Sequence, residues 1–382
     1  MAADRTWHFI TCEYPPQIGG VADFAHTVAR ELAHAGQPVH VWSPPPAAGG
    51  DGVTVHEVTG GYRASGLAAL DAALDALPPP RRVFVHWVPH GYGCKSLNVP
   101  FCLWVRRRAR RGDEVELMVH EPFLAFEGRR LRQNVGAVVH RAMLRLLLGV
   151  AQRVWVSTPS FIPDVRRFSP RGAPEGRWLP VPSPVAPVDD PNGVRTLRAE
   201  FARKGPLVGY FGTCSPVIAA RLAAVIEQLV LRRPDLRVAL IGRGTAAFLQ
   251  DLMARRRVPP GAVLASGERP YAEISLLLQA CDVFVQPYHD GVSVRRTTLM
   301  GLLEHGCAVV TSAGLRTEPF WFETDWARVT PPADPKAMAE AAVRLLDNDE
   351  ERSELGARAR AAYGRHFCVR RTLAALMVGS NA

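Results

Sequence analysis

The sequence predicts an α/β protein made of two Rossmann-like domains, each built on a doubly wound parallel sheet. At 382 residues the chain exceeds what one hydrophobic core usually serves, so two domains of about 180 residues are expected. Short apolar runs alternate with helical patterns along the whole chain, as in parallel α/β sheets. A proline-rich stretch interrupts this alternation near the middle and marks the expected boundary.

The first domain is expected over residues 1–180. Residues 6–11 read as a buried strand, and the helical pattern at 22–35 stops at Gly36 before a second strand at 39–42. This strand, helix and strand form the opening unit of a doubly wound sheet. Further strands are expected at 83–88, 115–119 and 154–157. Helices are expected at 65–77, 98–110 and 131–149.

Prolines at positions 180, 182, 184, 187 and 191 favour an extended connector, and we predict a linker over 181–200. The second domain is expected over residues 201–365, where the alternation restarts. Its strands are expected at 207–211, 238–241, 263–265, 283–286 and 308–311, with helices near 217–232, 245–256, 271–280, 293–304 and 335–345. A final helical segment, 350–377, ends the chain.

Composition narrows the class of protein. No apolar run reaches the roughly 18 residues that span a bilayer, and the first residues lack a secretory signal, so a cytoplasmic location is expected. Seven scattered cysteines, none closely paired with histidines, argue against a disulfide frame or a structural metal. Residues 81–171 carry the whole of the net charge of +10. The basic helices there suit either packing on their own sheet, which we favour, or peripheral contact with anionic membrane. Nucleic acid is not expected, because aromatics are not interleaved with the arginines in a recognisable nucleic-acid-binding module.

Four glycine-containing turns each follow a predicted strand and precede a predicted helix. Such turns present backbone amides and the positive end of a helix to an anion such as a diphosphate. Their candidate binding residues are Gly19 and Gly20, Gly212 and Thr213, Gly242 and Arg243, and finally Asp290, Gly291, Val292 and Ser293. A strand-to-helix turn without a ligand is the alternative for each of them.

The fourth turn is the most informative, because two arginines follow it. Ser293 is expected to cap a helix whose first turn contains Arg295 and Arg296. Cationic side chains oppose the dipole at this end of a helix. The pair therefore predicts a bound anion, such as a phosphate, in preference to a salt-bridged surface pair.

In the first domain, His120 follows the strand 115–119, at the sheet edge where ligands of α/β proteins collect. We predict a functional role for this histidine. The loop 88–98 follows another strand, and its residues His90, Tyr92 and Lys95 are candidates for contacts to hydroxyl or acidic groups of a substrate. A purely structural turn is an equally good interpretation of that loop.

Several of these segments together resemble glycosyltransferase family 4, the group 1 glycosyltransferases of GT-B fold. They are the Gly19-Gly20 turn, His120 and residues 211–213, 276–287 and 302–311. The resemblance implies two Rossmann-like domains facing each other across a cleft. It also implies a second domain that binds a nucleotide sugar of UDP or GDP type, a first domain that binds the acceptor, and a final helix, 366–382, that returns to the first domain. The implied reaction is hexosyl-type transfer with retention of configuration and without a metal or other cofactor.

The chain departs from the family pattern at two places. Cys214, Ser215 and Pro216 follow the glycine loop where the family has an arginine and a lysine that hold the diphosphate. Ser293 and Gly301 stand where the family has two glutamates eight residues apart. In this interpretation Arg295 or Arg296 neutralises the diphosphate, and Asp290 holds sugar hydroxyls.

Three alternatives remain open. One is an inverting enzyme with Asp23, His26 or His120 as general base, and another is a non-catalytic nucleotide-sugar-binding protein. A nicotinamide-dependent oxidoreductase is disfavoured, because the first strand is followed only by Gly19-Gly20 and not by the Gly-x-Gly-x-x-Gly pattern. The acceptor is open too: a sugar, a lipid-linked sugar or a natural-product aglycone would each fit.

Overall fold

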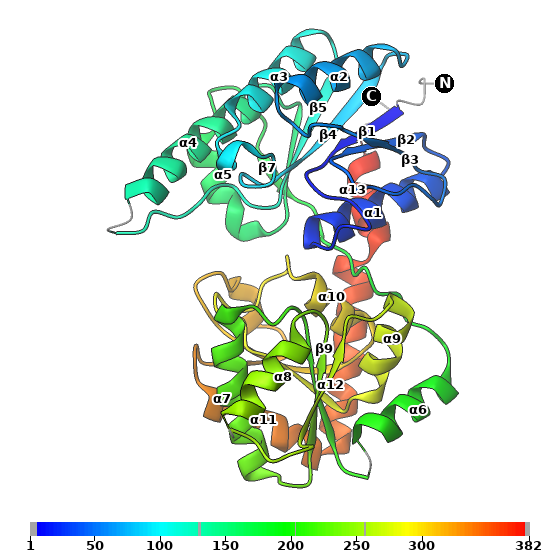
Figure 1. Ribbon diagram of the computed structural model, residues 1–382, viewed down its shortest axis with the longest axis vertical. Coiled ribbons are helices and arrows are strands. Elements are labelled where there is room, and N and C mark those ends of the chain that lie inside the picture. The colour runs from blue at the N-terminus through cyan, green and yellow to red at the C-terminus, as the bar shows by residue number, and fades with distance from the viewer. Residues whose placement is uncertain (1–5, 129–130, 203, 256, 379–382) are drawn as a thin grey trace. The chain divides into compact units, whose positions relative to one another are not determined.

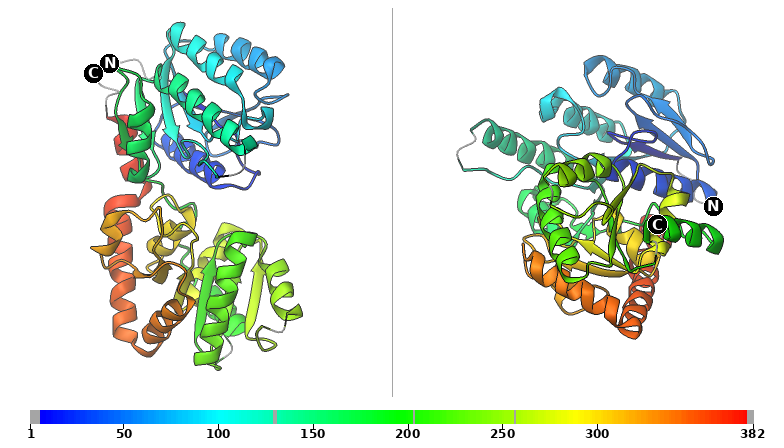
Figure 2. Two further views of the ribbon diagram at one scale, coloured as in Figure 1. Left: turned by 90° about the vertical axis from the view of Figure 1, so that its left-hand side faces the viewer. Right: turned by 60° about the horizontal axis from the view of Figure 1, so that its bottom comes forward.

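The computed structural model describes residues 6–128, 131–202, 204–255 and 257–378 (Figure 1). The chain forms two compact units. The first contains Met1–Pro182 together with Val369–Ala382, and the second contains Ser183–Cys368. The C-terminal helix α13 (Val369–Met377), red in Figures 1 and 2, thus belongs to the first unit.

The first unit is built on a seven-stranded sheet in the order β3-β2-β1-β4-β5-β6-β7. All of its neighbouring strands are parallel. The strands are β1 (Thr6–Ile10), β2 (Val39–Ser43), β3 (Thr54–Glu57), β4 (Arg81–Trp87), β5 (Glu114–Val119), β6 (Arg153–Val156) and β7 (Gly176–Trp178). The strand order reverses between β1 and β4, which makes that point the topological switch where ligands of such sheets bind.

Helices cover both faces of this sheet, because its strands place apolar side chains on both. Trp7 and Phe9 of β1 pack with Phe24 of α1 (Gly20–His34) and Leu376 of α13. The other face carries Ile10 and the apolar sides of four helices. These are α2 (Ala64–Asp75), α3 (Val99–Arg110), α4 (Leu131–Leu148) and α5 (Ile162–Phe168).

A buried ion pair ties α13 to the sheet. Arg82 on β4 bonds Glu116 on β5, and both side chains are almost fully excluded from solvent. The Arg82 guanidinium also donates to the Leu376 carbonyl at 2.7 Å and lies 3.6 Å above the Trp7 ring. Trp155 Nε1 donates to the second oxygen of Glu116 at 2.8 Å. Because a buried charge is costly without partners, these contacts make α13 part of the fold of the first unit.

The second unit contains a six-stranded sheet in the order β10-β9-β8-β11-β12-β13, again parallel throughout. Its strands are β8 (Leu207–Phe211), β9 (Arg237–Ile241), β10 (Val263–Gly267), β11 (Val283–Gln286), β12 (Ala308–Ser312) and β13 (Arg328–Thr330). Its helices are α6 (Pro191–Ala202), α7 (Pro216–Arg232), α8 (Thr245–Ala254), α9 (Tyr271–Ala280), α10 (Thr297–Glu304), α11 (Pro335–Asp347) and α12 (Asp349–Ala362). The switch point lies between β8 and β11. Two parallel α/β sheets in succession confirm the predicted two-domain, Rossmann-like fold.

The segment 181–200 differs from the extended linker that its prolines suggest. It is irregular up to Asp190, and α6 then begins at Pro191. Proline suits the first position of a helix, because its missing N–H has no partner there in any case. The proline that indicated a connector thus starts a helix.

Two further findings concern the whole described chain. All seven cysteines are free thiols. Among the described residues, none of the helices combines the length and the apolar character needed to cross a bilayer.

Candidate functional site

The carboxyl ends of β8 and β9 bring two of the predicted glycine turns into contact. The Gly212 amide donates to the Ile241 carbonyl at 2.9 Å, and the Cys214 amide donates to the Arg243 carbonyl at 3.0 Å. Gly242 has a φ of 119°, and a Cβ there would lie 2.7 Å from the Gly212 carbonyl oxygen. The close approach of the two backbones therefore requires glycine at 242.

These turns border the switch point directly. Gln286 at the end of β11 donates from Nε2 to the Phe211 carbonyl at 2.9 Å, joining the ends of β11 and β8. Thr213 and Arg243 are exposed beside them. Arg243 thus places a cation next to glycine backbone at the sheet edge that binds ligands in this fold.

The fourth turn, at residues 290–296, is fixed by a carboxylate from the connection between β12 and β13. Glu318, which is 2% exposed, accepts hydrogen bonds from Ser293 Oγ at 2.9 Å and from the Val294 amide at 3.3 Å. Trp321 Nε1 donates to its other oxygen at 2.9 Å. Glu318 could not be found from the sequence, since 24 residues separate it from Val294 and no motif links them.

Ser293 does not cap a helix, contrary to expectation. Helix α10 begins at Thr297, so Arg295 and Arg296 precede it and Arg296 occupies the position before its first residue. Glu318 takes up the Ser293 hydroxyl and holds residues 290–296 in a non-helical path. Gly291, with a φ of 91°, packs against Gly314, and Val292 is fully buried. The two arginines therefore lie before the amino end of α10 and outside the helix.

Both arginines bond one carboxylate, that of Asp290. Arg295 Nη2 lies 2.8 Å from one of its oxygens, and Arg296 bonds the other. Burial alone would raise the pKa of Asp290, but Arg296, Arg295 and His289 together lower it below its usual value. Two guanidinium groups share the Asp290 carboxylate, so these three side chains together carry a formal charge of +1. The guanidinium side chains are only 20% and 24% exposed, which makes this a partly buried cationic site.

A short chain of contacts links this cluster to the glycine turns. The Arg296 guanidinium lies 4.9 Å from the centre of the Tyr288 ring. The Tyr288 hydroxyl and Thr298 Oγ1 lie 3.2 Å apart, and the Thr298 methyl group lies 3.9 Å from the position of a Cβ on Gly212. The structure thus brings the candidate residues of the second unit together at one sheet edge.

In the first unit, the Gly19-Gly20 turn already holds an anion from its own chain. Glu13 Oε1 accepts hydrogen bonds from the Val21 and Ala22 amides at 3.1 and 3.0 Å. A Cβ on Gly19 would lie 2.0 Å from the same oxygen, so this close approach depends on glycine. The amino end of α1 does attract negative charge, and Glu13 supplies it in this conformation.

His120 lies just beyond β5 and contacts a second histidine that the sequence analysis missed. Its Nε2 is 3.2 Å from Nδ1 of His86, and the two rings stack with centroids 5.4 Å apart. Burial lowers the pKa of His120 to about 3, so the ring is neutral at physiological pH. His86 lies on β4 opposite Met118, two residues before His120, and strand pairing is the only signal that could have indicated it.

The three candidate acceptor residues have different environments. His90 and Lys95 are exposed, and His90 Nδ1 lies 3.7 Å from a Glu121 oxygen. Tyr92 is 1% exposed, and its hydroxyl donates to the carbonyls of Ile10 and His86. Tyr92 therefore supports the loop from the core and presents no side chain to a substrate.

The loop 94–96 that carries Lys95 has an unusual backbone. Cys94, Lys95 and Ser96 have φ values of 51°, 53° and 70°, which non-glycine residues seldom adopt. His140 Nε2 lies 2.7 Å from the Ser96 carbonyl oxygen and holds the loop. Such strain persists where surrounding structure fixes it, often beside a binding site.

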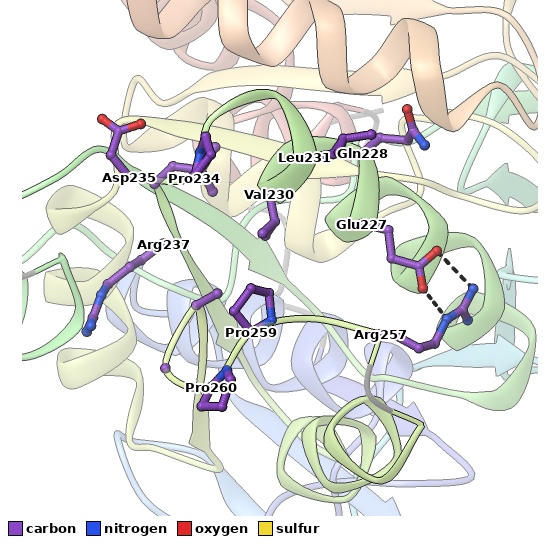
Figure 3. Close-up of a pocket in the computed structure, with 13 residues that line it drawn as sticks. Glu227, Gln228, Val230, Leu231, Pro234, Asp235, Arg237, Arg257, Pro259 and Pro260 are labelled. Carbon is purple, nitrogen blue, oxygen red and sulfur yellow. Dashed lines mark hydrogen bonds and ion pairs between the residues drawn. The ribbon is translucent and has the colours of Figure 1, made fainter.

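Two cavities of the second unit lie outside this cluster. One, of about 780 Å³, lies at the amino ends of β9 and β10 and is lined by Glu227, Arg237, Arg257 and Pro259 (Figure 3). Its Glu227 and Arg257 pair with each other, as Figure 3 shows. A smaller one of about 310 Å³ includes Pro287 and Ser312, at the carboxyl ends of β11 and β12. Within the described ranges, no group of three or more His, Cys, Asp or Glu side chains could hold a metal ion.

Comparison with known proteins agrees with the fold. Residues 205–348 match the family model for glycosyl transferases group 1. Sucrose-phosphate synthase from Thermosynechococcus elongatus is 16% identical, with a TM-score of 0.74 and 98% of each chain covered. Anabaena HepE, solved with UDP-glucose, is 15% identical with a TM-score of 0.71 over 99% of this chain and 100% of that one. WaaG, a glycosyltransferase involved in lipopolysaccharide biosynthesis, is 15% identical with a TM-score of 0.67 over 97% and 99%. No curated protein matches the sequence.

The two parallel α/β sheets, the matching family segment and the similar solved structures together support a glycosyltransferase of GT-B fold. The segment that matches the group 1 glycosyltransferases lies in the second unit, which supports the resemblance noted in the sequence for that part of the chain.

Proposed function

We propose that this glycosyltransferase moves a sugar from a nucleotide-diphosphate donor, of UDP or GDP type, to a hydroxyl group of an acceptor. The observation that carries the proposal is the Arg295–Asp290–Arg296 cluster beside the glycine turns of the β8–β11 switch point. This cluster lies inside the segment that matches the group 1 glycosyltransferases. Arginine binds phosphate oxygens through two parallel hydrogen bonds, so a diphosphate suits the pair.

The glycine turns would serve the same anion. Gly212 and Gly242 carry no side chain that blocks an approach to the backbone amides, and Arg243 adds a further exposed cation. Asp290 holds the arginines in place until the donor brings a greater negative charge to them. After that exchange Asp290 is available to sugar hydroxyls, the role proposed for it from the sequence.

The proposed reaction retains the anomeric configuration and needs no metal. The bond between the anomeric carbon and the phosphate oxygen breaks, and its electron pair leaves with the nucleoside diphosphate. The acceptor hydroxyl forms the new bond on the same face and passes its proton to the departing phosphate. The arginines neutralise charge on that phosphate, and His120 holds a sugar or acceptor oxygen, so catalysis rests on positioning and electrostatics.

The first test identifies the donor and challenges the arginines. A screen of nucleotide sugars by thermal shift should find one that raises the melting temperature, since ligands that bind only the folded state stabilise it. The Arg295→Ala/Arg296→Ala variant should then lose on the order of 100-fold or more in kcat/KM, because it loses preorganised charge at the leaving group. Arg255→Ala is the control, since Arg255 is exposed just after α8 and pairs in the described structure with Asp251 of that helix. Unchanged donor affinity and rate in the double variant would refute the assignment.

Product analysis separates the alternatives. NMR of the product gives the anomeric configuration; inversion would instead favour a general base among Asp23, His26 and His120. Full activity after treatment with EDTA is expected for a metal-free reaction. Donor binding without transfer to any acceptor would indicate a nucleotide-sugar-binding protein.

We further propose that the enzyme is cytoplasmic and contacts membrane peripherally through α4, which suits a lipid-linked acceptor. Leu131, Val135 and Val138 form one stripe on this helix and are 77%, 52% and 57% exposed. Arg132 and Arg145 are exposed on the same helix and would meet anionic headgroups. The protein should float with vesicles containing anionic phospholipid, and Val135→Glu/Val138→Glu should abolish this. Flotation of neither protein would leave a soluble sugar or an aglycone as the acceptor.

A further inference from the structure

His86 and His120 form a pair in which one ring controls where the proton of the other is placed. Only two neutral arrangements allow a hydrogen bond between His86 Nδ1 and His120 Nε2, which lie 3.2 Å apart. Either His86 donates from Nδ1, or His120 donates from Nε2. The two arrangements give His120 opposite chemistry at its remaining nitrogen, Nδ1.

The surroundings of His86 decide between them. His86 is fully buried, and its Nε2 has no hydrogen-bond partner among the described residues. The rings of Phe9, Phe24 and Phe84 lie 5.0, 5.6 and 4.8 Å from the His86 ring. If His120 donated, His86 would carry its own proton on Nε2, as a buried N–H without an acceptor. Orphaned buried N–H groups are rarer than orphaned acceptors, so the arrangement with a bare Nε2 is favoured.

His120 differs from His86 at its outer nitrogen. It is 9% exposed, and its Nδ1 has no hydrogen-bond partner in the described structure. That Nδ1 is not fully buried, so it keeps contact with solvent. A proton on Nδ1 of His120 can therefore be given to water or to a bound substrate oxygen.

We propose that His86 is a positioning residue that donates from Nδ1 to His120 Nε2 and so holds His120 with its proton on Nδ1. The inference rests on the proposed function only for the identity of the oxygen that receives this N–H. His120 then acts as a neutral hydrogen-bond donor to a sugar or acceptor hydroxyl. It has no free lone pair with which to take a proton from the acceptor, so it does not serve as the general base of an inverting reaction.

The pKa values of the two histidines, which burial lowers, also support this assignment. Burial lowers the pKa of His86 well below its ordinary value and that of His120 to about 3. Both rings are therefore neutral at physiological pH, and the tautomer alone sets which nitrogen of His120 donates.

Nitrogen-15 NMR of the full-length protein labelled on histidine tests the tautomer directly. The ring nitrogen shifts of His120, assigned by comparison with His120→Gln, should show a protonated Nδ1 and a bare Nε2. A protonated Nε2 on His120 would overturn the proposal. This measurement needs no substrate, so its result is independent of whether the proposed transfer reaction is correct.

Two variants at His86 add a functional readout. His86→Asn keeps an N–H donor near the position of Nδ1 and should retain both the His120 tautomer and a kcat close to that of the wild type. His86→Leu removes the donor, and kcat should fall on the order of 100-fold with little change in the KM for the donor, as when one preorganised donor is lost. Equal losses in both variants, or an unchanged kcat in His86→Leu, would contradict a role through the tautomer.

His8→Leu is the matched control. His8 lies on β1 of the same sheet, is also fully buried and also has an Nε2 without a partner, yet its ring contacts His40 and Trp42 instead of His120. It should lower the melting temperature without changing kcat or the His120 spectrum. If His86→Leu does not fold, the wild-type spectrum and His86→Asn still decide the proposal. If the wild-type enzyme transfers no sugar, the proposed function fails while the tautomer assignment stands or falls on NMR alone.

Discussion

Glu304, the last residue of α10, is a carboxyl group whose burial should make the protein's stability depend on pH. Burial raises its pKa to about 7, and bonds to Ser183 and Tyr363 offset this only in part. One of its oxygens, Oε2, is buried without a partner in the described structure. The folded protein therefore holds a proton that the unfolded chain releases near pH 4.5, the ordinary value.

The sign of the effect follows from that proton. Because the folded-state pKa is the higher one, the contribution of Glu304 to stability falls as pH rises from about 4.5 to about 7, by up to about 3 kcal/mol. Glu304→Gln should remove this slope and stabilise the protein at pH 8. Urea unfolding of both proteins at pH 5 and pH 8 measures it, with Glu340→Gln as an exposed control on α11. Equal pH dependence in wild type and Glu304→Gln would contradict the prediction.

Single residues were predictable where a local pattern defined their role. The close approach of the glycines at 212 and 242 could be expected from turn chemistry alone, whereas the anion-binding role of the paired arginines stays a prediction, because they precede α10 and do not form its first turn. The partners of these groups were not, since Glu318 and His86 reach their sites through tertiary contacts that no local pattern encodes. Glu13 lies only a few residues before the Gly19-Gly20 turn, yet nothing in the sequence says that its side chain folds back onto it.

At the scale of elements, the buried strands were predictable and the sheet edges were not. The central strands are continuous apolar runs because helices cover both faces of each sheet. The strands that the sequence analysis missed, β3, β7 and β13, are four, three and three residues long and are too short to show a period. The start of α10 was misplaced for another reason, since Glu318 competes for the serine expected to cap it.

The ion pair beneath α13 gives a prediction at this scale. Glu116→Gln leaves the buried Arg82 and the half-buried Arg153 without a full counter-charge, and should cost about 3–5 kcal/mol of unfolding free energy. Arg82→Met/Glu116→Leu removes the two most buried charges and should cost less, because of the three charges only Arg153 remains, and it still lies 3.8 Å from Glu114. Urea titrations of the two variants and the wild type give the comparison. A double variant less stable than Glu116→Gln would show that the charges contribute more than their desolvation costs.

At the scale of the whole molecule, the two units differ in how the chain forms them. The second unit is one continuous segment, whereas the first is assembled from both ends of the chain. Every member of the main hydrophobic cluster of the second unit lies between Val208 and Leu355. The first unit instead needs α13, whose Leu376 packs in its core and accepts a hydrogen bond from the buried Arg82. Because the second unit is a single segment with its own core, we expect it to fold by itself, whereas the first unit should not.

We expect a fragment of residues 183–368 to unfold cooperatively and to be stabilised by UDP or GDP, because the glycine turns and the arginine cluster lie entirely within it. It should transfer no sugar, since His120 is absent from it.

A fragment of residues 1–182 should be unstable or aggregate, because the surface of its sheet that α13 covers is left exposed. Adding a peptide of residues 369–382 should partly restore the stability of this fragment. Calorimetry of the three samples measures this. A stable 1–182 fragment would show that α13 is dispensable. If the full chain binds UDP or GDP but a folded 183–368 fragment binds neither, the donor site lies outside the second unit.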